Sequence, residues 1–223
     1  MNGILHRDIK PENLVFEKKG TNCSKKGWAG YLRLTDLGIA RIWKPENSSD
    51  TSGTPGYMAP EVMCRSNHGV AVDYYAVGII VYECMNGRRP YYGKSRQEIR
   101  DQILAKQVQI KKSDIPYNWS NESADFCNRL IQRKPQNRLG YSGPEEVKNH
   151  PWFKNFNWEK LVRKELPSPF LPEYDAEEYQ EQFMKNEDVV NPESTILLRR
   201  DSIQSTVGLM QTFSKSTNSM AWM

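Results

Sequence analysis

The stretch His6-Arg7-Asp8-Ile9-Lys10-Pro11-Glu12-Asn13 places a carboxylate, a cation and a side-chain amide close together along the chain. Transfer of a phosphoryl group to a hydroxyl needs a carboxylate for the acceptor proton, oxygen ligands that hold magnesium on the phosphates, and a cation that offsets charge. Asp8 would take the acceptor proton, and Lys10 would lie near the transferred group. Asn13 would be a magnesium ligand, because magnesium prefers oxygen donors. The stretch therefore supplies candidates for all three parts of a phosphoryl-transfer site.

Two further motifs follow in the order that such a site requires. Asp36-Leu37-Gly38 comes directly after a predicted strand, and Asp36 would be the second magnesium ligand. Ala59-Pro60-Glu61 closes the loop that begins at Asp36, a segment rich in Ser, Thr, Gly and Pro that is typical of an ordered loop. With these motifs in order, residues 1–153 resemble the eukaryotic-type protein kinase family.

The resemblance implies a serine/threonine kinase that uses ATP and Mg2+ as cofactors and acts on Ser or Thr of proteins. Gly53-Thr54-Pro55-Gly56-Tyr57-Met58 is similar to the substrate-docking loop of Ser/Thr kinases, so Thr54 is expected to bind substrate. Lys10 supports the same class, because tyrosine kinases usually place Ala-Ala-Arg in that part of the loop. Val15 matches a nucleotide-binding residue that lies beneath adenine.

The resemblance also implies a preference among protein substrates. Glu12 and Glu83 match the two glutamates with which basophilic members of the family bind an arginine two residues before the target. A carboxylate pair suits a guanidinium group, because both offer paired, planar contacts. The expected partners are therefore proteins whose Ser or Thr targets are preceded by Arg.

Other matched residues are expected to be structural. Asp73 matches a buried helix aspartate that anchors the catalytic-loop backbone. Arg138 matches an arginine that pairs with the glutamate of the Ala-Pro-Glu motif, here Glu61, and a bidentate pair of that kind holds a loop rigidly. Arg7 matches the arginine that pairs with a phosphate on the activation segment.

The activation segment departs from the family pattern at one position. The resembled kinases usually carry a phosphorylated threonine three residues before the glycine matched by Gly53, and Asp50 stands there. Asp50 offers one negative charge and fewer acceptor oxygens than a phosphate, so it would be a partial substitute. We predict weak dependence on an activating kinase, with Ser49 or Thr51 as the alternative phosphosite. An ordinary solvated aspartate is the competing interpretation.

The expected fold is mostly helical, with two short β-hairpins near the catalytic loop. Asn13–Glu17 and Tyr31–Thr35 are predicted strands, and Val72–Met85, apolar nearly all round, is predicted to be a central core helix. Three signals predict the starts of later helices. They are Ser95-x-x-Glu98, a cap at Ser120, and Ser142-x-x-Glu145 with Pro144 in the first turn.

The sequence predicts one kinase lobe followed by a tail. The glycine-rich loop, strand lysine and helix glutamate of the family should precede His6, so we expect residues 1–153 to be the C-terminal lobe, without the N-terminal lobe. The chain alone would then be a very poor kinase or none, with an apolar face that the missing lobe or another protein covers. The alternative function is a non-catalytic docking module derived from a kinase.

Residues 154–223 are expected to be a C-terminal extension that is partly disordered. Trp152-Phe153, Asn157-Trp158 and Pro167-Ser168-Pro169-Phe170-Leu171-Pro172 resemble the start of the tail of AGC kinases, a group that contains the cyclic-nucleotide-dependent kinases. Later in the tail, Arg199-Arg200-Asp201-Ser202-Ile203 is the pattern a basophilic kinase would select, so Ser202 is a candidate phosphosite. Chance proximity of arginines and a serine is the alternative.

Composition excludes several other classes of protein. The formal net charge of the 223 residues is only +4, and no basic run with interleaved aromatics suggests nucleic acid. The four cysteines form no closely spaced pair, which indicates a reducing compartment and a cytoplasmic location. The most apolar segment, Tyr74–Met85, is too short to cross a bilayer, so no membrane span is expected.

Overall fold

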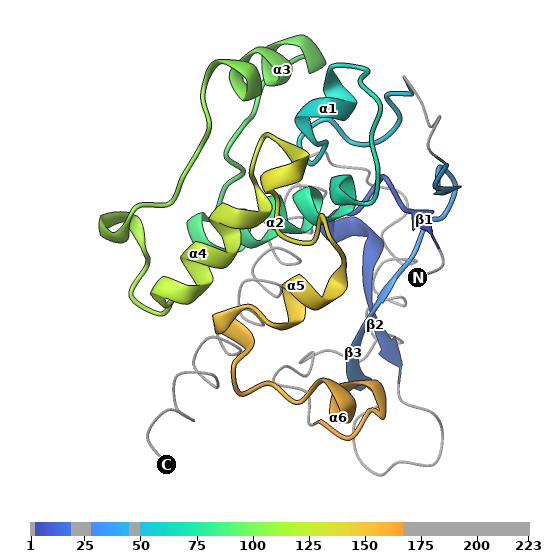
Figure 1. The fold of residues 1–223 in the computed structure, drawn as a ribbon, viewed down its shortest axis with the longest axis vertical. Helices are drawn as coiled ribbons and strands as arrows, with labels where there is room; N and C mark the ends of the chain where they lie inside the picture. Colours follow the sequence, from blue (N-terminus) through green and yellow to red (C-terminus); the bar gives the residue numbers. More distant parts are fainter. Residues whose placement is uncertain (1–2, 19–27, 45–49, 167–223) are drawn as a thin grey trace, which may run out of the picture.

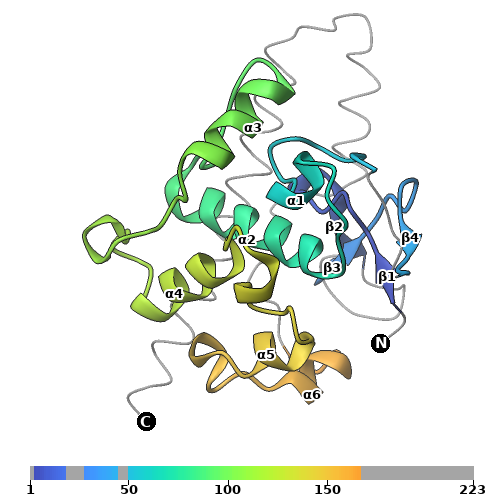
Figure 2. The same cartoon turned by 45° about the horizontal axis from the view of Figure 1, so that its top comes forward.

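The structure is a computed structural model that describes residues 3–18, 28–44 and 50–166 (Figures 1 and 2). It is mostly helical with few short strands, so the predicted fold class is confirmed at that level. The strands are β1 (Ile4–Leu5), β2 (Leu14–Lys18), β3 (Trp28–Leu34) and β4 (Arg41–Ile42). The α-helices are α1 (Pro60–Met63), α2 (Ala71–Asn86), α3 (Arg96–Ala105), α4 (Asn121–Leu130), α5 (Pro144–Lys148) and α6 (Trp158–Val162). Short 3-10 turns lie at Pro11–Asn13, Lys112–Asp114, Pro135–Asn137 and Pro151–Phe153.

Helix α2 is the centre of the molecule, as its apolar sequence predicts, and the other helices lie around it in Figure 1. It packs closely on the C-terminal end of α4, because a Cβ added at Gly78 would lie 2.7 Å from the Cβ of Leu130. The helix ends at Gly87, whose φ of 69° is the left-handed conformation that glycine adopts without strain. Residues buried with α2 include Tyr75, Ile79, Ile80, Ile103, Phe126 and Cys127.

The strands form two separate two-stranded antiparallel sheets. β2 and β3 form the predicted hairpin, with Leu14 opposite Leu34 and Phe16 opposite Leu32. The second hairpin was a wrong prediction. β1 pairs instead with β4, far along the chain, because the segment after Asp36 turns back beside the residues that precede His6. Strands of two residues give no alternation pattern that a sequence could reveal.

Two of the three predicted helix starts are present. The Ser95 hydroxyl accepts the Glu98 N–H at 3.2 Å at the head of α3, and Ser120 caps α4 through the Ser123 N–H at 3.2 Å. The capping box at Ser142 was a wrong prediction, although Pro144 does occupy the first turn of α5.

Gly143, not Ser142, is the residue that precedes α5, and its φ of 129° suits glycine. The carboxylate of Glu146, rather than that of Glu145, faces back to the turn. It accepts the N–H groups of Gly140 and Ser142 at 2.8 and 3.2 Å. The backbone N–H groups of this turn are thus satisfied by Glu146 and not by a capping box. Sequence spacing alone cannot distinguish the two arrangements.

An aromatic cluster seals the core where the last helices meet. Trp152 lies 5.0 Å from Phe126 and 6.3 Å from Trp119, measured between ring centroids. Phe153 lies 5.2 Å from Phe126 and 5.0 Å from Trp158 in tilted or edge-on geometry, which aromatic rings prefer. These contacts give Trp152 and Phe153 a structural role in the core.

Arg138 forms the expected bidentate pair with Glu61 and lies fully buried beside α1 and α2. Its two terminal nitrogens donate to the two Glu61 oxygens at 2.7 and 3.0 Å. Its Nη1 also donates to the Ala71 carbonyl at 2.8 Å, and the guanidinium lies 4.9 Å from the centre of the Tyr75 ring. These contacts fix the end of the segment that begins at Asp36 onto the helical core.

Replacing Arg138 by Met should lower the free energy of unfolding by about 3–5 kcal/mol, because the Glu61 charge is left buried and unpaired. Arg129→Met is the matched control, since Arg129 pairs with Asp125 at 2.9 Å on the surface and such pairs contribute under about 1 kcal/mol. Urea denaturation followed by circular dichroism measures both. Equal losses for the two variants would show that burial of the Arg138 pair has no special effect.

Candidate active site

Asp73 holds the start of the catalytic loop against α2. Its two carboxylate oxygens accept the backbone N–H groups of His6 and Arg7, each at 2.8 Å. Burial raises the pKa of Asp73, while the two amide bonds and the nearby Arg7 charge act in the opposite direction. Arg7 has a φ of 69°, a strained conformation for a residue with a long side chain, and these bonds stabilise it.

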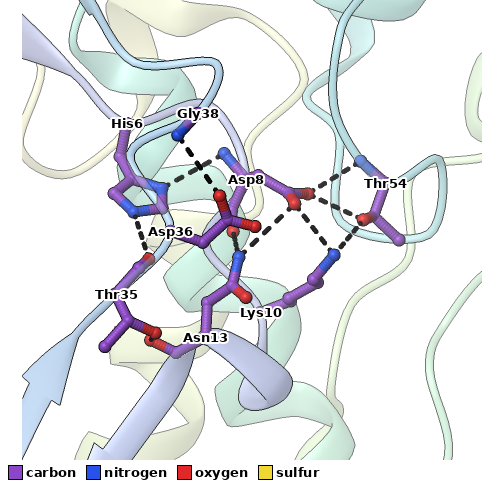
Figure 3. A network of polar contacts seen from close by, with 8 residues as sticks. All are labelled: His6, Asp8, Lys10, Asn13, Thr35, Asp36, Gly38 and Thr54. Atoms are coloured by element: carbon purple, nitrogen blue, oxygen red, sulfur yellow. Dashed lines mark hydrogen bonds and ion pairs between the residues drawn. The ribbon is translucent and has the colours of Figure 1, made fainter.

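His6 and Thr35 tie the end of β3 to the catalytic loop (Figure 3). The Asp8 N–H donates to Nδ1 of His6 at 3.3 Å, which leaves the proton on Nε2 to donate to the Thr35 carbonyl at 2.9 Å. The Thr35 N–H and hydroxyl both reach the Asn13 carbonyl, at 2.9 and 3.2 Å. Asp36 follows directly, so these bonds bring it beside Asp8 and Asn13.

The Asp8 carboxylate is surrounded by hydrogen-bond donors. One oxygen accepts Lys10 Nζ at 2.8 Å, and the other accepts the Thr54 N–H at 2.9 Å and the Thr54 hydroxyl at 2.7 Å. Burial on its own would raise the pKa of Asp8, but the bonds from Lys10 and Thr54 and the Lys10 charge outweigh it, and the net shift is downward. Asp8 is therefore ionised at neutral pH, and its carboxylate already accepts a hydrogen bond from one hydroxyl group, that of Thr54.

Asn13 and Asp36 are suited to a magnesium ion. The Asn13 amide nitrogen donates to the Asp8 carbonyl at 2.8 Å. This bond fixes the orientation of the side-chain amide and leaves its oxygen, Oδ1, as the atom that could bind a metal. Asp36 has a φ of 62°, and one of its oxygens accepts the Gly38 N–H at 3.2 Å. Within the described residues no donor occupies the Asn13 Oδ1 or the second Asp36 oxygen. Two oxygen ligands fit magnesium, which usually keeps waters and phosphate oxygens as its remaining ligands.

The four residues expected to bind nucleotide or substrate differ in burial and in their contacts. Thr54 contacts Asp8 directly, as given above. Glu83 is buried at the end of α2 and accepts the Tyr57 hydroxyl at 2.6 Å. Glu12 is exposed on the turn that precedes β2. Burial raises the pKa of both Glu83 and Tyr57, and the charge of Glu12 adds to both shifts. Val15 lies on β2 with 41% of its surface exposed.

Asp50 is held by arginines from two directions. Arg7 Nη1 lies 2.8 Å from one Asp50 oxygen, and Arg41 Nη2 lies 3.3 Å from the same oxygen. The other oxygen accepts the N–H and hydroxyl of Ser52 at 3.1 and 2.7 Å. The bonds from Arg7 and Ser52 lower the pKa of Asp50 to about 2. Asp50 thus makes the Arg7 contact expected of it and is not an isolated, solvated aspartate.

Thr51 has a partner that the sequence did not reveal. Arg96, at the head of α3, donates to the Thr51 hydroxyl at 3.3 Å and also to the Thr51 carbonyl and the Met58 sulfur. A contact between residues 45 apart has no local signature, so pattern analysis missed Arg96. Ser49, the other candidate phosphosite, lies outside the described residues.

The family model for the protein kinase domain matches residues 1–153. The chain therefore belongs to the protein kinase family. Among the relatives, the serine/threonine-protein kinase AtPK1/AtPK6 of Arabidopsis thaliana is 37% identical and covers 77% of this chain. Human cGMP-dependent protein kinase 2 is 36% identical over 77% of the chain, and human ribosomal protein S6 kinase alpha-6 is 34% identical over 76%. The chain is similar to each of these kinases over about three quarters of its own length.

The matched part is a minor fraction of each relative. The chain covers 34% of the Arabidopsis kinase and 21% of each of the two human kinases. In the part of the chain that the structure describes, no helix is long and apolar enough to cross a membrane.

Asp50→Asn should make the activation segment less firmly held near neutral pH. The native pKa of Asp50, about 2, lies below the usual value of 3.8, so its contribution to stability is complete above about pH 4 and is lost as the pH falls toward 2. The difference in unfolding free energy between wild type and Asp50→Asn should therefore shrink between pH 4 and pH 2. Urea denaturation at a series of pH values measures it.

Asp114→Asn is the control for Asp50→Asn, because Asp114 lies exposed on a surface turn and, within the described part of the chain, its side chain hydrogen-bonds only to the neighbouring Ser113. A difference that stays constant from pH 6 to pH 2 would contradict the proposed role of the Arg7 contact.

Proposed function

We propose that this chain is the catalytic, magnesium-binding lobe of a kinase that transfers the terminal phosphoryl group of ATP to Ser or Thr residues of proteins. The observation that carries the proposal is the ionised Asp8 carboxylate, held by Lys10 and Thr54 beside one oxygen each of Asn13 and Asp36 that accepts no hydrogen bond from the described residues. Magnesium held by these oxygens would supply positive charge that offsets the negative charge of the phosphates.

Each residue of the site has a distinct proposed role. Asp8 orients the acceptor hydroxyl and takes its proton. In the structure the Thr54 hydroxyl donates to this carboxylate, which shows that Asp8 can accept a hydrogen bond from a hydroxyl group. The Lys10 ammonium, 2.8 Å from Asp8 and 3.0 Å from the Thr54 hydroxyl, offsets negative charge on the transferred group. Asn13 and Asp36 supply the two protein ligands of the metal.

The exposed apolar residues on and beside the β2–β3 hairpin support a second, covering lobe. Residues 1–153 would form the C-terminal lobe, and a segment outside them, or another protein, would cover the exposed apolar side chains around the hairpin and complete the ATP site above Val15. The apolar side chains that remain exposed here are Val15 (41%), Leu32 (46%), Leu34 (43%) and Leu37 (66%).

Residues 154–223 are proposed to be an AGC-type extension. The Tyr31 hydroxyl donates to the Leu166 carbonyl at 2.8 Å, which supports an extension whose beginning runs back to β3. The cGMP-dependent and S6 kinases among the relatives are consistent with this group. A cytoplasmic location is also proposed, with Cys64, Cys84 and Cys127 as free thiols among the described residues.

The activation segment is proposed to be ordered without a phosphate at position 50. Asp50 supplies a permanent charge to Arg7 and Arg41, so the loop that carries Thr54 stays close to Asp8. Thr51, beside Arg96, is the described alternative phosphosite, and its phosphate would strengthen the same arrangement.

Substitutions at the two carboxylates should separate binding from chemistry in a protein that also contains the covering lobe. Asp36→Ala should abolish magnesium-dependent transfer and weaken binding of the magnesium–ATP complex. Asp8→Ala should stop transfer while leaving nucleotide affinity nearly unchanged, because Asp8 acts on the acceptor hydroxyl. Radiolabelled transfer and nucleotide titration measure the two properties. Equal losses of ATP affinity in both variants would contradict this division of roles.

The 223-residue chain without a covering lobe is the control for that experiment, and it should turn over far below the usual range of about 1–100 per second. Turnover within that range would contradict the need for a second lobe. A complete protein that binds substrate peptides without any transfer would instead favour the docking-module function.

Ser202, which lies outside the described residues, is proposed to be phosphorylated by this kinase in complete form or by a related basophilic kinase. A peptide of residues 197–205 should be phosphorylated, and replacing Arg200 in it by Ala should reduce the rate. Phosphopeptide mapping of the protein from its own cells is the second measurement. An unmodified Ser202 in cells together with an inert peptide would refute the proposal.

A further inference from the structure

Glu83 is a buried carboxylate with one strong hydrogen bond. It lies in the last turn of α2 with 6% of its surface exposed, and its Oε2 accepts the Tyr57 hydroxyl at 2.6 Å. Burial raises the pKa of Glu83, and the Tyr57 bond and the charge of Arg89 act against that shift. A buried carboxylate needs a nearby cation, and Arg89 is the one that approaches it most directly among the described residues.

Arg89 comes from the loop between α2 and α3 and lies across the substrate-docking loop. Its guanidinium carbon is 5.4 Å from the centre of the Tyr57 ring, within the range of a cation–π contact. A Cβ added at Gly56 would lie 2.8 Å from that same carbon and closer still to one guanidinium nitrogen. The Tyr57 ring, the Gly56 backbone and the Glu83 carboxylate thus form a slot that a guanidinium group fills.

The slot is connected to the catalytic carboxylate through the loop that carries Thr54. The Tyr57 N–H donates to the Thr54 carbonyl at 3.0 Å, and Thr54 contacts Asp8. A peptide whose acceptor hydroxyl reaches Asp8 would therefore pass near Glu83.

The contact between Arg89 and Glu83 is loose. Arg89 Nε lies 4.0 Å from Oε1 of Glu83, beyond hydrogen-bond length, and 34% of the Arg89 side chain is exposed. Partly exposed ion pairs contribute about 1 kcal/mol or less, so a better-placed guanidinium could displace this one. A second cation could not share the slot with Arg89 without repulsion between like charges.

We propose that Arg89 is an internal guanidinium ligand of Glu83 that competes with an arginine side chain of a peptide substrate. Arg89 then determines specificity, because it reduces the advantage of substrates that carry an arginine before the target residue. The inference rests on the proposed function, since it assigns the slot to the substrate of the same site.

Peptide binding to the 223-residue chain tests the competition without requiring phosphoryl transfer. The probes are the peptide of residues 197–205, fluorescently labelled, and the same peptide with Arg200→Ala, and anisotropy gives their Kd values. The discrimination is the Kd of the Arg200→Ala peptide divided by that of the parent peptide. In Arg89→Ala this ratio should rise about tenfold above the wild-type ratio, equivalent to about 1.4 kcal/mol.

Arg88→Ala is the matched control, because it removes the same charge from an exposed neighbour and should leave the ratio at the wild-type value. Arg89→Gln keeps most of the side-chain stem, so it should raise the ratio even if Arg89→Ala folds poorly. Glu83→Gln added to Arg89→Ala should remove the gain, because the carboxylate that attracts the peptide arginine is lost.

Three results would overturn the inference. They are an unchanged or lower ratio in both Arg89 variants, an equal rise in Arg88→Ala, and no detectable binding of either peptide to any variant. The proposed function fails separately, if the complete protein transfers no phosphoryl group while the Arg89 variants still gain discrimination. A transferring kinase with an unaffected ratio would overturn only the role of Arg89.

Discussion

The bonds from the Asp73 carboxylate to the amides of His6 and Arg7 are the contact on which the rest of the site depends. Because Arg7 is in a left-handed conformation, its N–H reaches α2 while its guanidinium extends to Asp50. One residue therefore connects the central helix, the catalytic loop and the activation segment. Asp8, the next residue, is positioned as a result. Loss of Asp73 would release all three segments together, which no single substitution at the exposed edge of the site would do.

Three acid–arginine pairs in this protein differ in burial, and the difference matches what each does. Arg138 and Glu61 are fully buried and bidentate, which suits a permanent fixture of the fold. Arg7 and Asp50 are joined by one short bond, and the Asp50 side chain is 26% exposed, which suits a loop that is held from the surface. Arg89 and Glu83 are separated by 4.0 Å, and this looser contact can exchange with a ligand. The same kind of ion pair thus holds the fold where it is buried, and can take part in ligand recognition where it is more exposed to solvent.

The sequence predicted what local pattern and motif spacing determine. The apolar segment 72–85 has no polar face, so only a central helix could bury it, and Asp8, Asn13 and Asp36 occupy a motif order that phosphoryl transfer requires. The pairing of β1 with β4 and the contact of Arg96 with Thr51 depend on how long loops return in space, which no local pattern encodes. Arg89 at Glu83 was missed for another reason. An arginine in a polar loop is expected to be solvated, and its position over Gly56 follows only from the packed geometry.

The order in which the chain is made has a consequence for how the site is assembled. His6 and Asp73 are 67 residues apart, and Glu61 and Arg138 are 77 apart, so the catalytic loop leaves the ribosome long before the partners that hold it. At a synthesis rate of about 5–20 residues per second, roughly 7 to 26 seconds separate Asp8 from Arg138. During that interval the nascent chain exposes α2, its most apolar helix, until α4 has been made to cover it. The nascent chain is therefore most exposed to aggregation, and most in need of a chaperone, between the synthesis of α2 and that of α4.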